Sequence, residues 1–247
     1  MHTAASDGQG CVADKYACAA ARGLKEIAIC DHGFGSILLH STRRKFDVQN
    51  GDILKAAAMK SVTVRQSIEA SVVNDAGDID VPDDIIARCD VLHLGFHRLM
   101  QFGYIRRAPQ FMLVNGWGTK SARLDEDLVE YNTRAFSNAL RRYPVDVLCH
   151  LNHRAQVDVK RIAEVALERG VYIELNEKHI ETMESAIGIL LESGVTFILG
   201  SDAHRTAQTG LFLRVTEFIK RHGIPEERIC GVGAEPRFKP KKNKTEV

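Results

Sequence analysis

The feature that most constrains this chain is a regular alternation of short apolar runs with amphipathic helical runs along nearly its whole length. The apolar runs show no strict two-residue alternation, which is typical of parallel strands buried on both faces. Six predicted strands cover residues 26–30, 63–71, 91–96, 145–151, 171–176 and 196–201. Seven predicted helices cover residues 12–23, 51–59, 82–88, 124–142, 157–169, 180–193 and 212–222. This alternation predicts an α/β fold with a parallel sheet.

A single domain is expected over residues 1–247, because neither a linker nor a shift of composition divides the chain. A chain of this length can bury one large core, and α/β barrels of this size are common. A doubly wound open sheet is the alternative, but it usually shows a glycine-rich nucleotide loop after its first strand, which is not evident here. The basic run KPKKNK at 239–244 is interpreted as part of a flexible, solvated tail at about 239–247.

Composition narrows the classes of partner and compartment. The 33 Lys and Arg residues nearly balance the 32 Asp and Glu residues, so no overall field favours nucleic acid or a membrane surface. No apolar run reaches the ~18 residues that span a bilayer, and no signal peptide is recognisable. The six cysteines include no C-x-x-C pair, and several lie in apolar runs, which indicates buried thiols rather than disulfides. A cytoplasmic protein is therefore expected, and its oligomeric state cannot be read from the sequence.

Histidines and carboxylates gather at the ends of five predicted strands. A lone histidine after a strand is usually an ordinary hydrogen-bonded residue, and we assign five to that class: His40, His93, His153, His179 and His222. The groups at the strand ends are Asp31, His32, Glu69, His97, His150, Asp202 and His204. Because parallel strands of a barrel deliver their terminal side chains to one face, these groups are expected to meet. Imidazoles and carboxylates that converge in this way are typical of a metal cluster.

Several stretches together carry a family resemblance, namely HTAASDG, GLKEIAICDHG, SIEASVVNDAGDIDVPDDI, LGFH, VDVLCHLNH and VTFILGSDAH. On these stretches the chain resembles the PHP (polymerase and histidinol phosphatase) family of metal-dependent phosphoesterases, from residue 2 to about 211. The resemblance implies a distorted (β/α)₇ TIM-like barrel. The family pattern opens with His-x-His, and His2 matches its second histidine. The first histidine and its strand are not in the sequence, so a truncated first strand is expected.

The resemblance also implies the ligands of a di- or trinuclear site containing zinc, manganese or iron, with Glu69 as the carboxylate shared between two metals. One branch of the family places a histidine just beyond Asp7, where this chain has Gly8. A ligand set without thiolates agrees with these metals but does not choose among them. The implied ligands are His2, Asp7, His32, Glu69, His97, His150, Asp202 and His204.

The implied activity is hydrolysis of a small phosphorylated substrate, with Glu69, Asp202 and His204 as catalytic residues. Arg205 and Arg44 are candidates to bind the phosphate, because a phosphate's free oxygens require positive charge. The irregular segment after residue 97 adds Arg106, Arg107 and Trp117 as further candidates near the site. Asp31 either orients a ligand imidazole or is a solvent-facing turn residue.

Two other functions stay open at this point. The first is a degenerate, non-catalytic metal-binding scaffold, and the reason to consider it is that the first histidine of the family pattern has no match. The second is an amidohydrolase-type C–N hydrolase, for which a metal-bridging lysine would be expected where this chain has Glu69. The near-neutral charge makes a nucleic-acid substrate less attractive than a small molecule.

Overall fold

The computed structural model describes residues 1–37, 39, 41–97 and 126–241. Its centre is a seven-stranded sheet in which the strands follow one another in chain order and every neighbouring pair is parallel. The strands are β1 (Glu26–His32), β2 (Thr63–Ser71), β3 (Val91–Gly95), β4 (Val147–Leu148), β5 (Tyr172–Asn176), β6 (Phe197–Gly200) and β7 (Ile229–Cys230). The predicted parallel α/β fold is therefore confirmed, although β4 is shorter than the predicted 145–151 and β7 had no counterpart.

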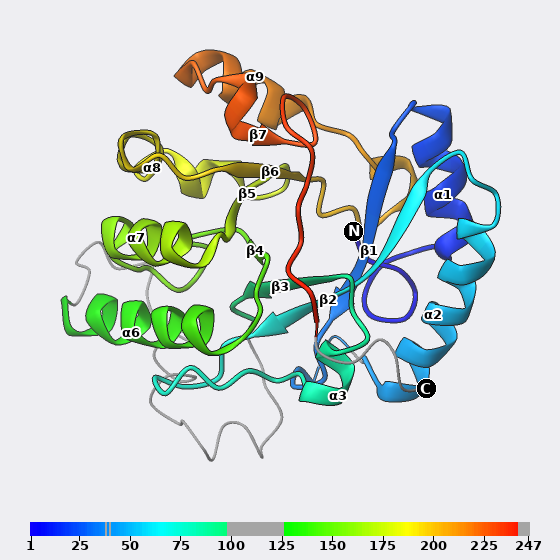
Figure 1. The fold of residues 1–247 in the computed structure, drawn as a ribbon, viewed down its shortest axis with the longest axis horizontal. Helices are drawn as coiled ribbons and strands as arrows, with labels where there is room; N and C mark the ends of the chain where they lie inside the picture. Colours follow the sequence, from blue (N-terminus) through cyan, green and yellow to red (C-terminus); the bar gives the residue numbers. More distant parts are fainter. Residues whose placement is uncertain (38, 40, 98–125, 242–247) are drawn as a thin grey trace.

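Helices alternate with these strands (Figure 1). They are α1 (Val12–Ala21), α2 (Arg43–Ala57), α3 (Asp83–Ile86), α6 (Glu126–Arg142), α7 (Val159–Arg169), α8 (Ile187–Ser193) and α9 (Leu213–His222). Short 3-10 helices are η1 (Ile180–Met183), η2 (Thr206–Gln208) and η3 (Glu226–Arg228). The predicted helix 180–193 is thus divided into η1 and α8. Helix α2 begins before the predicted residue 51, because the Thr42 side chain accepts a hydrogen bond from the Lys45 amide and caps it.

The helices cover the two ends of the sheet, and the main core lies between them and the strands. Helices α1 and α2 lie beside β1 and β2, whereas α6, α7, α8 and α9 lie beside the later strands (Figure 1). Apolar side chains such as Leu92, Leu94 and Ile173 form the core on the helix side of the sheet. Each of the six cysteines is a free thiol, and four of them are buried, as predicted. No helix in the described ranges is both long enough and apolar enough to cross a bilayer.

The strands form a half-barrel that is open between β1 and β7, which are not paired with each other. The N-terminal residues lie at this opening, where the Cys30 amide donates to the Met1 carbonyl (2.9 Å) and the His2 amide donates to the Ala203 carbonyl (3.0 Å). A cavity of about 770 Å³ lies inside the half-barrel, and Glu69 is one of the residues that line it. The strand order and the alternation of strands with helices therefore agree with the predicted TIM-like barrel, but the sheet does not close.

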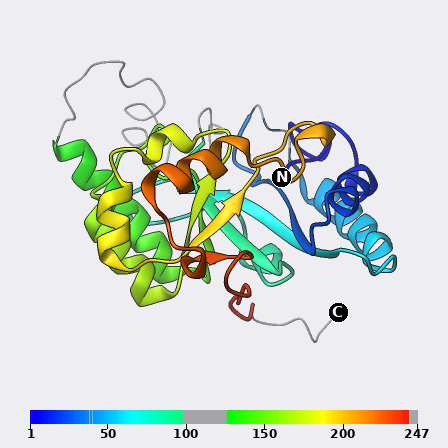
Figure 2. The same cartoon turned by 90° about the horizontal axis from the view of Figure 1, so that it is seen from above.

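The prediction of a flexible tail from residue 239 is wrong for residues 239–241. The Lys239 amide donates to Asp146 Oδ1 (2.8 Å), and the Lys241 ammonium donates to Asp146 Oδ2 (2.5 Å). Asp146 is only 1% exposed, and a buried carboxylate needs paired charge, which these lysines supply. Phe238 packs beside Val91 and Val147 at the same place. The C-terminal segment and the N-terminus thus lie at opposite ends of the strands (Figure 2).

Candidate metal centre

Glu69 lies at the centre of the groups predicted to bind metal. It is near the end of β2 and pairs in register with His32, the last residue of β1. Its Oε1 atom lies 2.8 Å from His150 Nε2 and 3.3 Å from His97 Nε2. Its Oε2 atom lies 3.3 Å from His32 Nδ1 and 3.7 Å from His2 Nε2. One oxygen therefore faces each of two sets of imidazoles, which is the arrangement of a bridging carboxylate.

The first set, which we call the loop group, consists of His2, Asp7, His32 and His204, whose ligand atoms all lie within 4.8 Å of one another. Asp7 joins two of the rings, with Oδ1 3.3 Å from His32 Nε2 and Oδ2 3.2 Å from His204 Nε2. The His2 and His32 rings are stacked, with centroids 4.3 Å apart. Three imidazoles and one carboxylate thus surround a single point.

The second set, which we call the strand group, consists of His32, Glu69 and His97, again within 4.8 Å, with His150 against Glu69. His97 lies two residues after the end of β3, and its Nδ1 atom is 2.6 Å from the Ser71 hydroxyl at the end of β2. That hydrogen bond fixes the ring and turns Nε2 toward Glu69.

Asp202 lies against the loop group, just after the end of β6. Its Oδ1 atom is 3.1 Å from His2 Nε2 and 3.4 Å from His204 Nδ1. Its backbone has φ 45°, a left-handed conformation that non-glycine residues seldom adopt and that is often found at functional sites. All eight predicted ligands are therefore brought together, whereas their binding of metal stays a prediction.

The protonation of these groups suits cation binding. Burial lowers the pKa of His2 to about 4 and also lowers the pKa of His97, so both imidazoles are neutral at pH 7. Burial opposes the charge on Glu69, but the nearby imidazoles, His97 first, hold its pKa well below the usual value. His150 differs, because burial is outweighed by the hydrogen bond to Glu69 together with the negative charges of Glu69, Glu174 and Asp202, which raise its pKa to about 9. A cation must therefore displace a proton from His150.

Two observations test whether these residues fit divalent cations. The His2 Nδ1 and His32 Nδ1 atoms are buried without a hydrogen-bond partner, although His32 Nδ1 lies in ion-pair range of Glu69. Such unpaired ring nitrogens are costly unless something else binds them. The donors are nitrogen and oxygen only, which suits zinc, manganese or iron. The residues therefore fit a centre of two or more such cations.

Asp31 holds the loop that carries His2 and Asp7. It is 5% exposed and accepts hydrogen bonds from the Thr3 amide (2.7 Å), the Thr3 hydroxyl (2.6 Å) and the Ser6 hydroxyl (2.5 Å). The Gln49 side chain donates to it as well. Both roles considered for Asp31 are therefore replaced by a third, in which it positions two predicted ligands through the backbone between them.

Glu174 supports the strand group from inside the half-barrel. Its Oε2 atom accepts hydrogen bonds from the His150 backbone amide (3.0 Å) and from Asn176 Nδ2 (3.0 Å). His150 has φ 30°, so this bond holds a strained backbone in place. Glu174 fits only because residue 200 is glycine, since a Cβ atom there would lie 1.8 Å from Glu174 Oε1.

The sequence analysis missed two histidines at the centre. His179 Nε2 lies 3.8 Å from Asp202 Oδ2, and the His179 ring stacks on His153 with centroids 3.8 Å apart. Both residues closely follow predicted strands, so the strand-end rule that identified the predicted ligands would also have placed these two histidines near the centre. His93 and His222 behave as predicted, with ordinary partners in Ser67 and Glu184.

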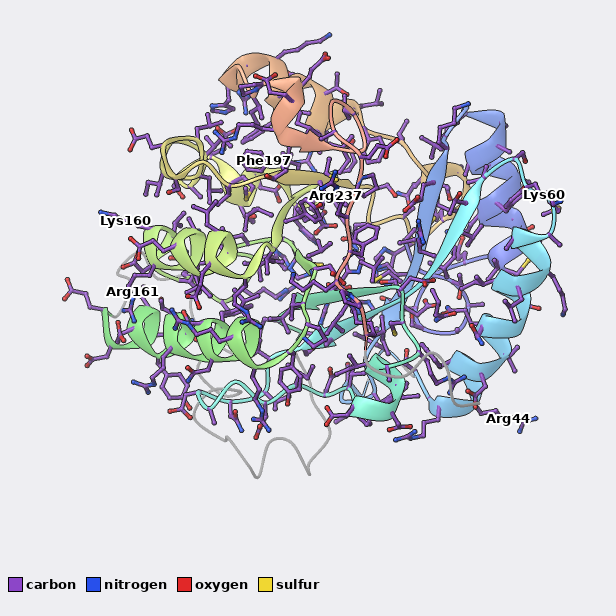
Figure 3. The ribbon with its side chains drawn as sticks, viewed as in Figure 1. Arg44, Lys60, Lys160, Arg161, Phe197 and Arg237 are labelled. Atoms are coloured by element: carbon purple, nitrogen blue, oxygen red, sulfur yellow. The ribbon has the colours of Figure 1, made fainter. Side chains whose placement is uncertain are left out.

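The predicted phosphate-binding arginines lie apart from each other. Arg205 follows His204 directly and is exposed, and its backbone amide donates to Gln208 Oε1. Arg44 is exposed near the start of α2 and extends outward at the edge of the molecule (Figure 3). His40, Arg106, Arg107 and Trp117 lie outside the described residues.

Comparison with known proteins places this geometry in context. No protein-family model matches the chain. A protein of Shewanella loihica named "Probable phosphatase" is 28% identical, and the match covers 92% of this chain and 85% of that protein. A "Probable phosphatase" of Caldanaerobacter subterraneus is 25% identical over 72% of this chain but only 65% of that protein.

The fold is that of a solved histidinol phosphate phosphatase of Lactococcus lactis, which was crystallised with zinc, L-histidinol and phosphate. The TM-score is 0.61 at 14% sequence identity, and the match covers 91% of this chain and 92% of that one. Relatives named as phosphatases and a fold shared with a phosphatase together support a phosphoesterase.

Proposed function

We propose that this protein belongs to the PHP family and is a metal-dependent phosphoesterase that hydrolyses small phosphate esters at the centre formed by the loop group and the strand group. The observation that carries the proposal is Glu69, because each of its two oxygens faces a different set of imidazoles. Two or three zinc, manganese or iron ions are the proposed cofactors. The zinc and phosphate in the Lactococcus lactis structure support both the cation and the kind of substrate.

The proposed chemistry assigns a part to each catalytic residue. Bound divalent cations would lower the pKa of a water molecule and neutralise the charge on the phosphoryl oxygens. Glu69 contacts four imidazole rings and so helps to position them; they belong to His2, His32, His97 and His150. Asp202 is buried, yet the hydrogen bond from His2 holds its pKa well below the usual value, so it is ionised and can hold a cation or accept a hydrogen bond at Oδ2. His204 stays beside it because its Nδ1 atom donates to the Asp202 carbonyl (2.8 Å).

Glu69 bears on one of the two rival functions. An amidohydrolase-type site would be expected to have a lysine between its metals, whereas within the described residues a carboxylate, Glu69, lies between the two groups. A non-catalytic scaffold is separated by experiment only, because it would keep the same ligands.

The test is a metal-replete screen of phosphate monoesters and diesters with zinc, manganese or iron, repeated on Glu69→Ala. Metal cations contribute several kcal/mol of charge stabilisation, so we expect Glu69→Ala to lower kcat by roughly 10³-fold and to lose bound metal in elemental analysis. Glu192→Ala, an exposed position on α8, is the matched control and should behave as wild type. Fewer than two metals per chain together with no hydrolysis of any ester would contradict the proposal and favour the scaffold.

A further inference from the structure

A set of basic side chains that no predicted role uses lies along one side of Asp202. We call it the basic rim, and it consists of Lys178 and His179 after β5 and of His153 and Arg154 after β4. Lys178 Nζ lies 3.9 Å from Asp202 Oδ2 and 3.4 Å from His204 Nδ1. His179 Nε2 lies 3.8 Å from the same carboxylate oxygen. The rim therefore borders the centre on the side of Oδ2, whereas His2 occupies the side of Oδ1.

Ring stacking and hydrogen bonds hold the side chains of the basic rim in place. The His179 and His153 rings are stacked at 3.8 Å with an interplanar angle of 27°, and His153 lies 5.4 Å from the His150 ring. Arg154 Nε donates to His153 Nε2 (2.9 Å), which fixes that ring. The His179 amide donates to Asn176 Oδ1 (3.1 Å), so the turn that carries Lys178 and His179 is tied to the end of β5. These contacts hold His179 at the edge of the centre.

Lys178 and His179 offer different groups to an anion. An imidazole carries at least one N–H, and the His179 side chain is 20% exposed beside Asp202. Lys178 supplies a full positive charge, and its side chain is 49% exposed while that of Asp202 is 10% exposed. The contact of Lys178 with Asp202 is longer than a hydrogen bond, so the ammonium can turn toward another acceptor at the mouth of the site.

We propose that Lys178 and His179 bind the terminal phosphoryl oxygen that a phosphate monoester has and a diester lacks, and that they make this site selective for monoesters. The inference rests on the proposed phosphoesterase function. A monoester carries three terminal oxygens and close to two negative charges, whereas a diester carries two terminal oxygens and one charge. If cations at the loop group and the strand group each take one oxygen, the third is left for the rim. A charge-assisted hydrogen bond is the strong kind, so its loss is measurable.

The experiment compares kcat/KM for p-nitrophenyl phosphate and bis(p-nitrophenyl) phosphate with the metal-replete protein. Lys178→Met should lower the value for the monoester by about 10- to 100-fold, the range for a hydrogen bond to a charged group, and change the diester value far less. Lys178→Arg should recover most of the monoester activity. The inhibition constant of inorganic phosphate should rise in Lys178→Met, while the metal content stays as in wild type.

Lys160→Met on the surface of α7 is the matched control and should leave both substrates unchanged (Figure 3). His179→Ala should act in the same direction as Lys178→Met. An equal loss on both esters, or an unchanged monoester value in Lys178→Met, would overturn the inference and leave the proposed function standing. A wild-type protein that hydrolyses neither ester with any of the three metals would overturn the proposed function, and this inference with it.

Discussion

The loop group and the strand group share His32 but are held in place by different means. The strand group takes its side chains from the ends of β1 and β2 and the residue just after β3, and the Glu69 side chain is 6% exposed. The loop group takes His2 and Asp7 from the N-terminal segment and His204 from the segment after β6, and the Asp7 side chain is 29% exposed. Paired strands carry His32 and Glu69, whereas His2 and Asp7 lie on a loop that Asp31 holds through side-chain hydrogen bonds.

Because the two groups are held in place differently, they should differ in how sensitive they are to single substitutions. The sheet ladder cannot be removed by one substitution, so the strand group is expected to keep its shape in most variants. The loop group depends on Asp31, which accepts hydrogen bonds from Thr3 and Ser6. We therefore expect the strand group to bind its cation more tightly and the loop group to lose its cation first.

The largest effect that would sharpen this comparison is expected from Asp31→Asn. The amide group places a donor against the Thr3 and Gln49 donors, so the free energy of unfolding should fall by about 2 to 4 kcal/mol. Elemental analysis should show the loss of the loop-group cation with the strand-group cation retained. Asp47→Asn, at an exposed position on α2, serves as control, and urea unfolding should place it within about 0.5 kcal/mol of wild type. Equal loss of both cations would break the comparison.

A smaller effect, on the strand group instead of the loop group, is expected from Glu174→Ala. It leaves the buried His150 amide without its acceptor, which should cost about 1 to 3 kcal/mol. Because Glu174 positions His150, the strand group should lose roughly 10- to 100-fold in metal affinity, whereas the loop group, which is coupled to it only through Glu69, should lose less. Glu174→Gln keeps an acceptor oxygen and is the matched control. Titration of the metal-free protein with Zn²⁺ measures both steps of binding, and a loop group weakened as much as the strand group would contradict the assignment.

The last effect concerns pH and the metal-free protein. The pKa of His2 is about 4 in the folded protein, against the ordinary value of 6.5 in the unfolded chain, so the unfolded chain takes up the proton first and stability falls as pH drops below 6.5. The pKa of His150 is about 9 when folded, so its contribution is complete below pH 6.5 and is lost as pH rises toward 9. Each limb is limited to about 1.4 kcal/mol per pH unit.

Urea midpoints of EDTA-treated protein between about pH 5 and 9 would measure these limbs. His2→Gln should flatten the acid limb, which belongs to the loop group, and His150→Gln should flatten the alkaline limb, which belongs to the strand group. A stability profile that either variant leaves unchanged would show that the corresponding histidine does not titrate as the structure indicates.

Much of the centre could be predicted because the strand ends could be predicted. Glu69, His97 and His150 follow apolar runs that are long enough to recognise, and parallel strands bring such positions to one face. The same rule missed His153 and His179 only because a single histidine near a strand is usually an ordinary residue. Strand β7 could not be found, because two residues carry no periodic signal.

Contacts between distant parts of the chain were beyond the sequence. The Lys241–Asp146 ion pair joins residues 95 positions apart, so Lys241, which the sequence places in a solvated tail, is instead buried against a carboxylate. The role of Asp31 was hidden for the same reason, since nothing in the sequence shows that the Thr3 and Ser6 hydroxyls reach it.

The sharing of Glu69 has a consequence for how the centre fills. A cation that arrives at either group draws on the negative charge of the one carboxylate that the other group also faces. Occupancy of the two groups is then a linked equilibrium, in which the second affinity depends on whether the first position is already filled. A binding isotherm fitted with two independent constants would therefore describe neither position correctly.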